Sequence, residues 1–206
     1  MSYSERISRN NAYYALFYDN LRNRTDKRNY CELLQLFTSK IKNKEGVILD
    51  IGSGLGQHLS YFKEKGFKAI GIEPSPVLRN LCEQSGLEVI DGSFETLATL
   101  SLPKIAGIWC AASLLHVPLN EVPLAAQTMS GLLEQDDPLF VTVRTGSEGY
   151  WDNYDSNSDV KRFIQLFDPA ELINIFSQHN LNEQYKRLED SYWGRKATWY
   201  SGIFTR

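Results

Sequence analysis

The stretch from Val47 to Phe62, VILDIGSGLGQHLSYF, constrains the fold of this chain more than any other. An apolar run ends in an acid, three glycines follow at alternate positions, and a helical pattern of apolar residues then begins. Glycines in such a turn let the backbone approach a ligand closely. The stretch therefore predicts a strand, a ligand-binding turn and a helix in direct succession.

Further strand-like segments alternate with helical patterns along the rest of the chain. Strands are expected at 47–51, 68–73, 87–92, 105–110, 139–146, 181–189 and 197–206, and helices at 56–66, 75–86, 120–133 and 168–180. Strands separated by helices form a parallel sheet with helices on both faces, whereas the short connector before the last strand joins antiparallel strands. We expect an α/β fold: a doubly wound, mostly parallel, seven-stranded Rossmann-like sheet with a C-terminal antiparallel strand.

The length of 206 residues suits a single domain. Two helical patterns, within 11–21 and 29–41, precede an α/β core at 46–206. Residues 147–163 lack helical and strand periodicity and follow the fifth strand, so they are expected to form a loop at the edge where specificity usually lies. The ligand is expected at the carboxyl ends of the strands, beside the glycine turn.

Composition limits the class of protein. The net charge is −3, which argues against a general nucleic-acid binder, and three scattered cysteines fit a reducing compartment. No apolar run approaches the ~18 residues of a membrane span, and no His or carboxylate cluster has the spacing of a metal site. We expect a cytoplasmic enzyme or binding protein without a membrane partner; its oligomeric state is open.

The glycine turn can be compared with the known nucleotide-binding turns. A Walker turn needs a lysine after its last glycine, and none is present. The dinucleotide fingerprint GxGxxG matches at Gly52 and Gly54, but its third position is Gln57, and Gly56 comes one residue early. Glu73 ends the second expected strand, where an acid hydrogen-bonds ribose hydroxyls whatever the base. A nucleoside ligand is indicated, with a purely structural tight turn as the alternative.

The pattern from Asp50 to Gly56, acid–x–G–x–G–x–G, resembles the first motif of the class I S-adenosylmethionine-dependent methyltransferases. Residues 71–78 and 89–97 resemble the second and third motifs of this family. Residues 105–118 resemble the fourth-strand segment of a small-molecule subgroup, and the similarity covers most of the chain from about Ala12 onward. The resemblance implies S-adenosyl-L-methionine as the cofactor.

The resemblance also implies which residues contact that cofactor. Asp50 would lie near its amino group, Glu73 at its ribose, and the backbone after the fourth strand beside its methionine part. The third motif departs from the family because Ser93 replaces the usual acid, so the adenine contact is shared among three residues. The implied set is Asp50, Gly52, Gly54, Gly56, Glu73, Pro74, Asp91, Ser93, Phe94, Cys110 and Ala111.

The N-terminal region, residues 1–45, resembles the helical lid of the same subgroup. Tyr14, Tyr18 and Thr25 are candidates for groups that close over the cofactor. The alternative for each is a helix that packs its aromatic face on the core.

Methyl transfer from a sulfonium is an in-line displacement, so the protein has mainly to position and desolvate the reactants. His116 is the best candidate for a general base, with a role as a pocket residue as the alternative. The segment CAAS after the fourth strand lacks the motifs of nucleic-acid methyltransferases. We expect a small-molecule acceptor with an oxygen, nitrogen or sulfur nucleophile.

Arg144, Tyr150 and Trp151 are the candidate acceptor-binding residues. Arg144 could face an anionic group of the acceptor, or it could pair with Glu148 or Asp152. The aromatic and acidic loop could cover an apolar or cationic acceptor, or it could be a solvated loop pinned by its aromatic rings. Two rival functions stay open: a nicotinamide-dependent oxidoreductase, and a cofactor-binding regulatory protein that has lost catalysis.

Overall fold

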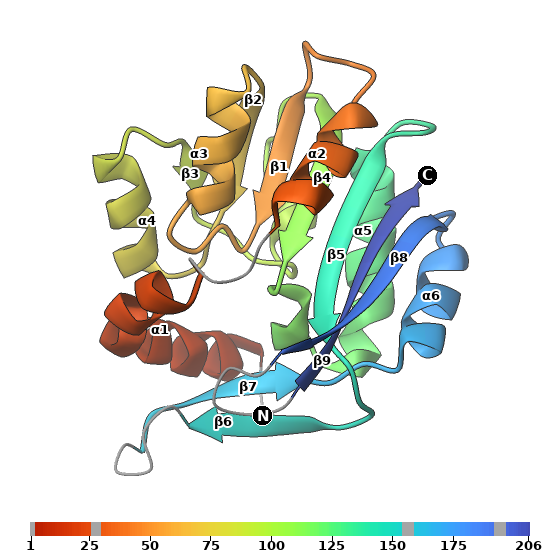
Figure 1. Cartoon of the computed structure of the whole chain (residues 1–206). Helices are drawn as coiled ribbons and strands as arrows, with labels where there is room; N and C mark the ends of the chain where they lie inside the picture. The colour runs from red at the N-terminus through yellow and green to blue at the C-terminus, as the bar shows by residue number, and fades with distance from the viewer. Residues whose placement is uncertain (1–2, 26–29, 154–158, 192–196) are drawn as a thin grey trace.

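The computed structural model describes residues 3–25, 30–153, 159–191 and 197–206. A seven-stranded sheet in the order β3-β2-β1-β4-β5-β9-β8 forms its centre (Figure 1). Its strands are β1 (Val47–Ile51), β2 (Lys68–Ile72), β3 (Val89–Ile90), β4 (Ile105–Ala111), β5 (Pro138–Arg144), β8 (Asn182–Ser191) and β9 (Ala197–Thr205). The pairs among β1 to β5 are parallel, and β9 runs antiparallel to both β5 and β8. The expected fold class is confirmed.

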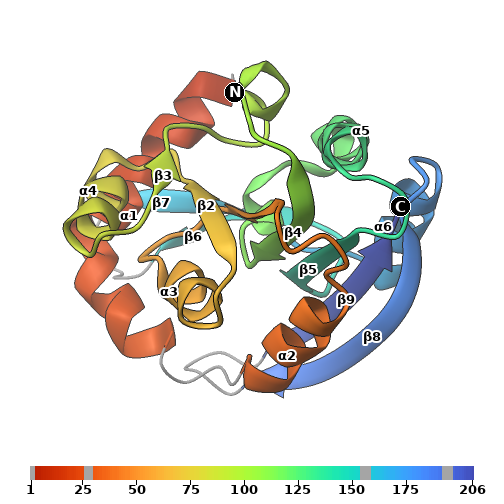
Figure 2. The ribbon, with the colours of Figure 1, turned by 90° about the horizontal axis from the view of Figure 1, so that it is seen from above.

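Helices cover both faces of the sheet (Figure 2). They are α2 (Cys31–Ser39) and α3 (Gln57–Glu64) on one face, with α4 (Pro76–Gln84) beside α3, and α5 (Val122–Leu132) and α6 (Pro169–Ser177) on the other. Side chains of β1 alternate between the two faces: Val47, Leu49 and Ile51 pack on the α5 side, and Ile48 packs on the α2 side. None of the helices in the described part of the chain is long and apolar enough to cross a membrane.

Local sequence signals explain where several helices begin and end. The carboxylate of Asp168 accepts a hydrogen bond from the Ala170 N–H at 2.9 Å and caps α6, with Pro169 in the first turn. Gly66 and Gly86 follow α3 and α4 with φ of 81° and 70°, a left-handed conformation that glycine adopts without strain.

The second N-terminal helix departs from the expected lid. Helix α2 packs on the sheet, because the buried side chains of Leu33, Leu34 and Phe37 face the core and the Phe37 ring lies 5.2 Å from the Trp109 ring. Only α1 (Tyr3–Thr25) lies across the carboxyl ends of the strands (Figure 1), with a kink at Phe17. The side chain of the lid candidate Thr25 lies outside the described residues.

The segment expected as an irregular loop is a β-hairpin. Strands β6 (Gly149–Asn153) and β7 (Lys161–Gln165) pair antiparallel as a separate two-stranded sheet, and residues 154–158 between them are not described. Trp151 pairs with Phe163, whose N–H donates to the Asn10 side chain of α1 at 2.8 Å. Helix α1 and this hairpin together cover the carboxyl edge of the sheet (Figure 1).

Candidate cofactor and acceptor site

A cavity of about 430 Å³ lies at the carboxyl ends of the strands, enclosed by α1 and the hairpin. This volume falls within the usual range of small-molecule sites. The sequence-predicted residues that line it are Gly52, Gly54, Glu73, Pro74, Ser93, Phe94, Ala111, Tyr14, His116 and Arg144. Those that are not part of its lining are Asp50, Gly56, Asp91, Cys110, Tyr18, Tyr150 and Trp151.

The three glycines of the turn have different roles. All have positive φ, at 75°, 57° and 75° in chain order. A Cβ atom on Gly52 would lie 2.3 Å from the Ser113 Cβ, and one on Gly56 would lie 2.4 Å from the Leu87 Cδ1. A Cβ atom on Gly54 would meet no protein atom within 4 Å. Gly52 and Gly56 are therefore required for packing, and Gly54 is the position that keeps the cavity open.

Glu73 follows β2 and is 5% exposed. Its Oε2 accepts a hydrogen bond from the Gly54 N–H at 3.0 Å, and its Oε1 accepts one from the Ser75 N–H at 2.9 Å. Burial raises the pKa of Glu73 to about 7, although these two hydrogen bonds oppose the shift. Each oxygen keeps a further acceptor site, which suits a pair of ribose hydroxyls.

Asp50 ends β1 beneath the glycine turn and is 1% exposed. Neither carboxylate oxygen has a hydrogen-bond partner among the described residues. Burial, followed by the charge of Glu73, raises the pKa of Asp50 well above its ordinary value. An unpaired buried carboxylate is costly unless a cation compensates it. The site therefore fits a ligand whose ammonium group lies near the turn.

The residues that share the expected adenine contact separate in the structure. Ser93 and Phe94 are nearly buried and line the cavity, and the Ser93 hydroxyl bonds the Tyr3 hydroxyl of α1. Asp91 lies on the surface and pairs with Arg79 at 2.8 Å. Ser93 and Phe94 are thus available to a ligand in the cavity, and the Asp91 side chain is directed elsewhere.

His116 belongs to a chain of hydrogen bonds that joins three parts of the protein. Its Nδ1 lies 2.7 Å from the Phe163 carbonyl oxygen, which can only accept, so Nδ1 carries the proton. Its Nε2 therefore accepts from the Tyr14 hydroxyl at 2.6 Å. The Arg162 Nη1 donates to the same tyrosine oxygen at 2.9 Å. The network links α1, β7 and the turn after β4.

The electrostatics of this network keep His116 neutral. Burial, followed by the charge of Arg162, lowers the pKa of His116 to about 3. Burial raises the pKa of Tyr14. Asp152 pairs with Arg162 at 3.1 Å and so balances its charge. In this arrangement the Nε2 lone pair of His116 is occupied, so a proton from an acceptor would have to pass through the Tyr14 hydroxyl.

Polar side chains of α1 attach the lid at several points. Arg6 is 5% exposed and bridges Glu95 at 2.8 Å and Glu121 at 2.7 Å. The Asn11 side chain donates to the Pro74 carbonyl at 3.0 Å. Arg6, Asn10, Asn11 and Arg162 are not among the residues predicted from the sequence. A polar position in an aromatic helix, or an arginine in a segment without periodicity, does not indicate which distant residue it contacts.

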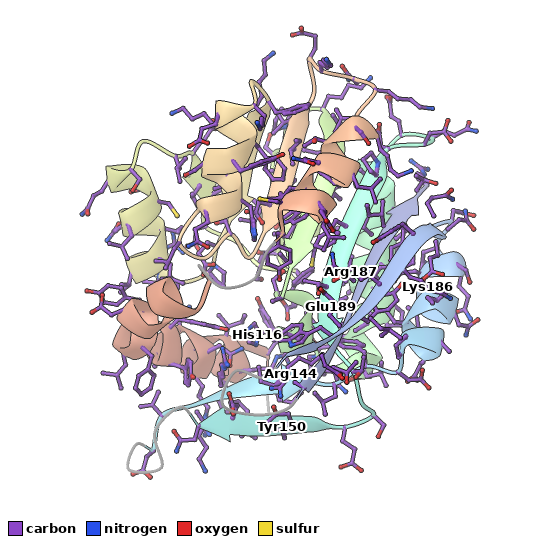
Figure 3. All side chains as sticks on the ribbon, viewed as in Figure 1. His116, Arg144, Tyr150, Lys186, Arg187 and Glu189 are labelled. Carbon is purple, nitrogen blue, oxygen red and sulfur yellow. The ribbon has the colours of Figure 1, made fainter. Side chains whose placement is uncertain are left out.

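Arg144 ends β5 and lines the cavity, and β1 and β4 separate β5 from β2, the strand that Glu73 follows. Its Nη1 donates to the Tyr150 hydroxyl of β6 at 2.6 Å (Figure 3). Within the part of the chain that the structure describes, neither Glu148 nor Asp152 forms an ion pair with it. Trp151 instead contacts the Phe163 ring and the lid, with the Arg9 guanidinium 5.4 Å from its ring.

The thiols near the site are buried and unreactive. Cys110 is 0% exposed, its Sγ lies 3.1 Å from the Ser113 Oγ, and burial raises its pKa to about 12. Cys110 thus packs at the end of β4, and it is not part of the cavity lining. The described residues contain no group of His, Cys, Asp and Glu side chains that could hold a metal ion.

Comparisons with known proteins agree with this geometry. Residues 22–188 match the family model described as a methyltransferase domain. An uncharacterized methyltransferase of Alkaliphilus oremlandii (strain OhILAs) is 27% identical over 137 residues, which cover 60% of this chain and 61% of that protein. Another, from Oceanobacillus iheyensis, is 23% identical over 176 residues, which cover 77% of this chain and 80% of the relative.

A solved structure shares the fold over the whole chain. It is the Burkholderia thailandensis 1,6-didemethyltoxoflavin-N1-methyltransferase, with bound 1,6-didemethyltoxoflavin and S-adenosylhomocysteine. The TM-score is 0.74 at 15% sequence identity, and the match covers 100% of this chain and 92% of that one. At this identity the likeness establishes the fold.

Proposed function

The chain belongs to the methyltransferase-domain family, and we propose that it transfers the methyl group of S-adenosylmethionine to an oxygen, nitrogen or sulfur atom of a small-molecule acceptor. One observation carries the proposal: the same cavity is lined by the glycine turn and Glu73 and by the protic groups of Tyr14 and His116. The Burkholderia thailandensis neighbour is named for the methylation of a small molecule, which supports this class of acceptor.

The residues of the cavity fit the proposed cofactor. Glu73 would accept hydrogen bonds from the ribose hydroxyls. Asp50, which is not part of the lining, would compensate the amino group of the methionine part from its buried position at the end of β1. Ser93 and Phe94 would border the adenine, and the backbone of Ala111 would border the methionine part. When bound, the cofactor supplies a methyl group on a positively charged sulfur, and its departure in an in-line displacement requires little beyond alignment.

The protein's main contribution would be to align the reactants and exclude water. The ion pairs of Arg6 and the bond from Asn11 to Pro74 hold α1 over the cavity. A closed and desolvated cavity strengthens each electrostatic contact within it. His116 would orient Tyr14, and a role as general base would require the tyrosine hydroxyl to relay the proton.

The proposal is tested by measuring the S-adenosylhomocysteine released when the protein is incubated with S-adenosylmethionine and a panel of small hydroxyl, amine, thiol and carboxylate compounds. Gly54→Val serves as the inactive control, because its side chain would enter the cavity. We expect acceptor-dependent release from the wild-type protein alone. Release with a peptide or nucleic acid but with none of the small compounds would contradict the acceptor class. Cofactor binding without release under any condition would favour a regulatory role.

A further inference from the structure

Five charged side chains of the described residues line the cavity, and four of them are balanced within the protein or by the proposed cofactor. Glu95 pairs with Arg6, and Asp152 pairs with Arg162. Glu73 accepts two backbone N–H bonds and faces the ribose position. Arg144 is the fifth, and no carboxylate in the described residues forms an ion pair with it. As far as the structure describes the lining, Arg144 is therefore its one cation without a compensating carboxylate.

The surroundings of Arg144 leave part of its guanidinium without a partner. Nη1 donates to the neutral Tyr150 hydroxyl, and the buried Nε has no hydrogen-bond partner among the described residues. The rings of Tyr150 and Trp199 each lie 6.0 Å from the guanidinium carbon. A cation without a counter-ion is costly in a partly buried site, and an anion from a ligand that contacts the guanidinium within the cavity would balance its charge.

The position of Arg144 assigns such an anion to the acceptor and not to the cofactor. Arg144 ends β5, whereas Glu73 follows β2, and β1 and β4 lie between these strands. His116 lies in the turn after β4, the strand next to β5, and both His116 and Arg144 line the cavity. Figure 3 shows His116 and Arg144 near the carboxyl ends of the strands, with Tyr150 below Arg144. An anion bound here would hold an acceptor near the Tyr14–His116 pair.

We propose that the methyl acceptor carries a carboxylate group and that Arg144 binds it. A guanidinium presents a planar fork of donors that matches a planar carboxylate, and the rings of Tyr150 and Trp199 offer an apolar wall to the body of the molecule. Among the described residues, Arg144 is the one cation of the lining without a carboxylate partner, and its charge matches one negative charge and not the two of a phosphate monoester. The inference rests on the proposed function, since it concerns the acceptor half of the same cavity.

The test uses benzoate and benzamide, which have nearly the same shape and differ in charge. Each is titrated by calorimetry up to about 10 mM, with and without saturating S-adenosylhomocysteine. We expect benzoate to bind the wild-type protein and benzamide to bind much more weakly. Arg144→Gln should weaken benzoate binding by at least about 30-fold, because it removes one partner of a buried charge pair. Phenyl phosphate in place of benzoate distinguishes a phosphate-bearing acceptor.

Two further variants keep the result interpretable. Arg187→Gln makes the same change on β8 outside the cavity, and it should bind benzoate like the wild type. Tyr150→Phe keeps the charge of Arg144 but removes the hydroxyl that positions it, and should weaken benzoate binding severalfold without making benzamide bind better. Thermal melting of each variant establishes that it is folded. If Arg144→Gln does not fold, Tyr150→Phe decides the question.

Equal binding of benzoate and benzamide, no binding of benzoate in either state, or unchanged benzoate binding in Arg144→Gln would overturn the proposal. Tighter binding of phenyl phosphate than of benzoate would overturn the carboxylate assignment. The S-adenosylhomocysteine titration separates the two claims. If that ligand binds and benzoate does not, the inference fails while the proposed cofactor stands; if only benzoate binds, the proposed function fails instead.

Discussion

Glu73→Gln is the substitution whose effect can be worked out most fully from the structure. The glutamate oxygens accept the N–H groups of Gly54 and Ser75 and, in the proposed complex, two ribose hydroxyls. A glutamine keeps the shape but replaces one acceptor oxygen with a donor NH₂ group, so one backbone N–H loses its partner in either orientation. We expect the affinity for S-adenosylhomocysteine at pH 8 to fall by about 1.5–3 kcal/mol, or roughly 10- to 150-fold.

The same substitution should change how binding depends on pH. Because the pKa of Glu73 is raised to about 7 in the cofactor-free protein, about nine tenths of the protein carries the carboxylate at pH 8 and about one tenth at pH 6. The carboxylate is the form with free acceptors for the ribose. Wild-type affinity should therefore fall about tenfold from pH 8 to pH 6, and Glu73→Gln should lack that fall.

Calorimetric titration at pH 6, 7 and 8 measures both effects. Glu83→Gln, on the exposed face of α4, is the matched control and should behave like the wild type. Equal affinity of Glu73→Gln and the wild type at pH 8 would refute the ribose assignment. An unaltered pH slope in Glu73→Gln would show that another group accounts for the proton linkage.

Three further substitutions test other parts of the site. Gly54→Val should abolish binding of S-adenosylhomocysteine in calorimetry, because its side chain would enter the cavity. Gly66→Val is the control: Gly66 also has a positive φ and open space around it, so both substitutions should introduce about 1–2 kcal/mol of backbone strain, but Gly66→Val should leave binding intact. Asp50→Asn should weaken binding about tenfold yet raise the melting temperature of the cofactor-free protein at pH 8. The pKa of Asp50 is raised in the folded state, so its carboxylate destabilises the fold increasingly as the pH rises. The increase in melting temperature on Asp50→Asn should therefore shrink toward pH 4, and an equal increase at pH 8 and pH 4 would contradict this explanation. The pKa of His116 is lowered to about 3 in the folded state, so the stability it confers is lost as the pH falls below its unfolded value of 6.5. In denaturant unfolding, the free energy of unfolding of the wild type should be about 2 kcal/mol lower at pH 5 than at pH 8 because of His116. His116→Gln should lack this part of the decrease, and equal decreases in both proteins would exclude the effect.

The sheet and the glycine turn could be predicted from the sequence because their signals are local. The apolar run VILDI, the three glycines and the acid at position 73 each specify a backbone conformation or a buried position over a few residues. The short connector before the last strand likewise fixes an antiparallel pair. Such signals require no knowledge of distant partners.

The lid was only partly predictable, because its packing depends on contacts that are remote in sequence. Helix α2 is amphipathic like any surface helix, and only the structure places Phe37 against Trp109. The strands β6 and β7 mix aromatic and charged residues without alternation, because successive residues on both faces of the hairpin are partly or fully buried. A two-residue period marks a strand that has one buried face and one solvated face, and this hairpin has no such division.

The residues that complete the cavity were the least predictable. Arg162 follows Asp152 by ten positions and pairs with it across the hairpin, and it reaches Tyr14 over a separation of 148 residues. No pattern in the sequence distinguishes this arginine from a solvent-exposed one. His116 was identified as a candidate by residue type and position, and the structure adds the tyrosine that occupies its ring nitrogen.

The central claim is that the cavity binds S-adenosylmethionine. The most direct test is a calorimetric titration of the wild-type protein with S-adenosylmethionine, S-adenosylhomocysteine and NADH, side by side. We expect the first two to bind with one site per chain, at a dissociation constant on the order of micromolar, and NADH not to bind. Binding of NADH alone, or of none of the three, would contradict it.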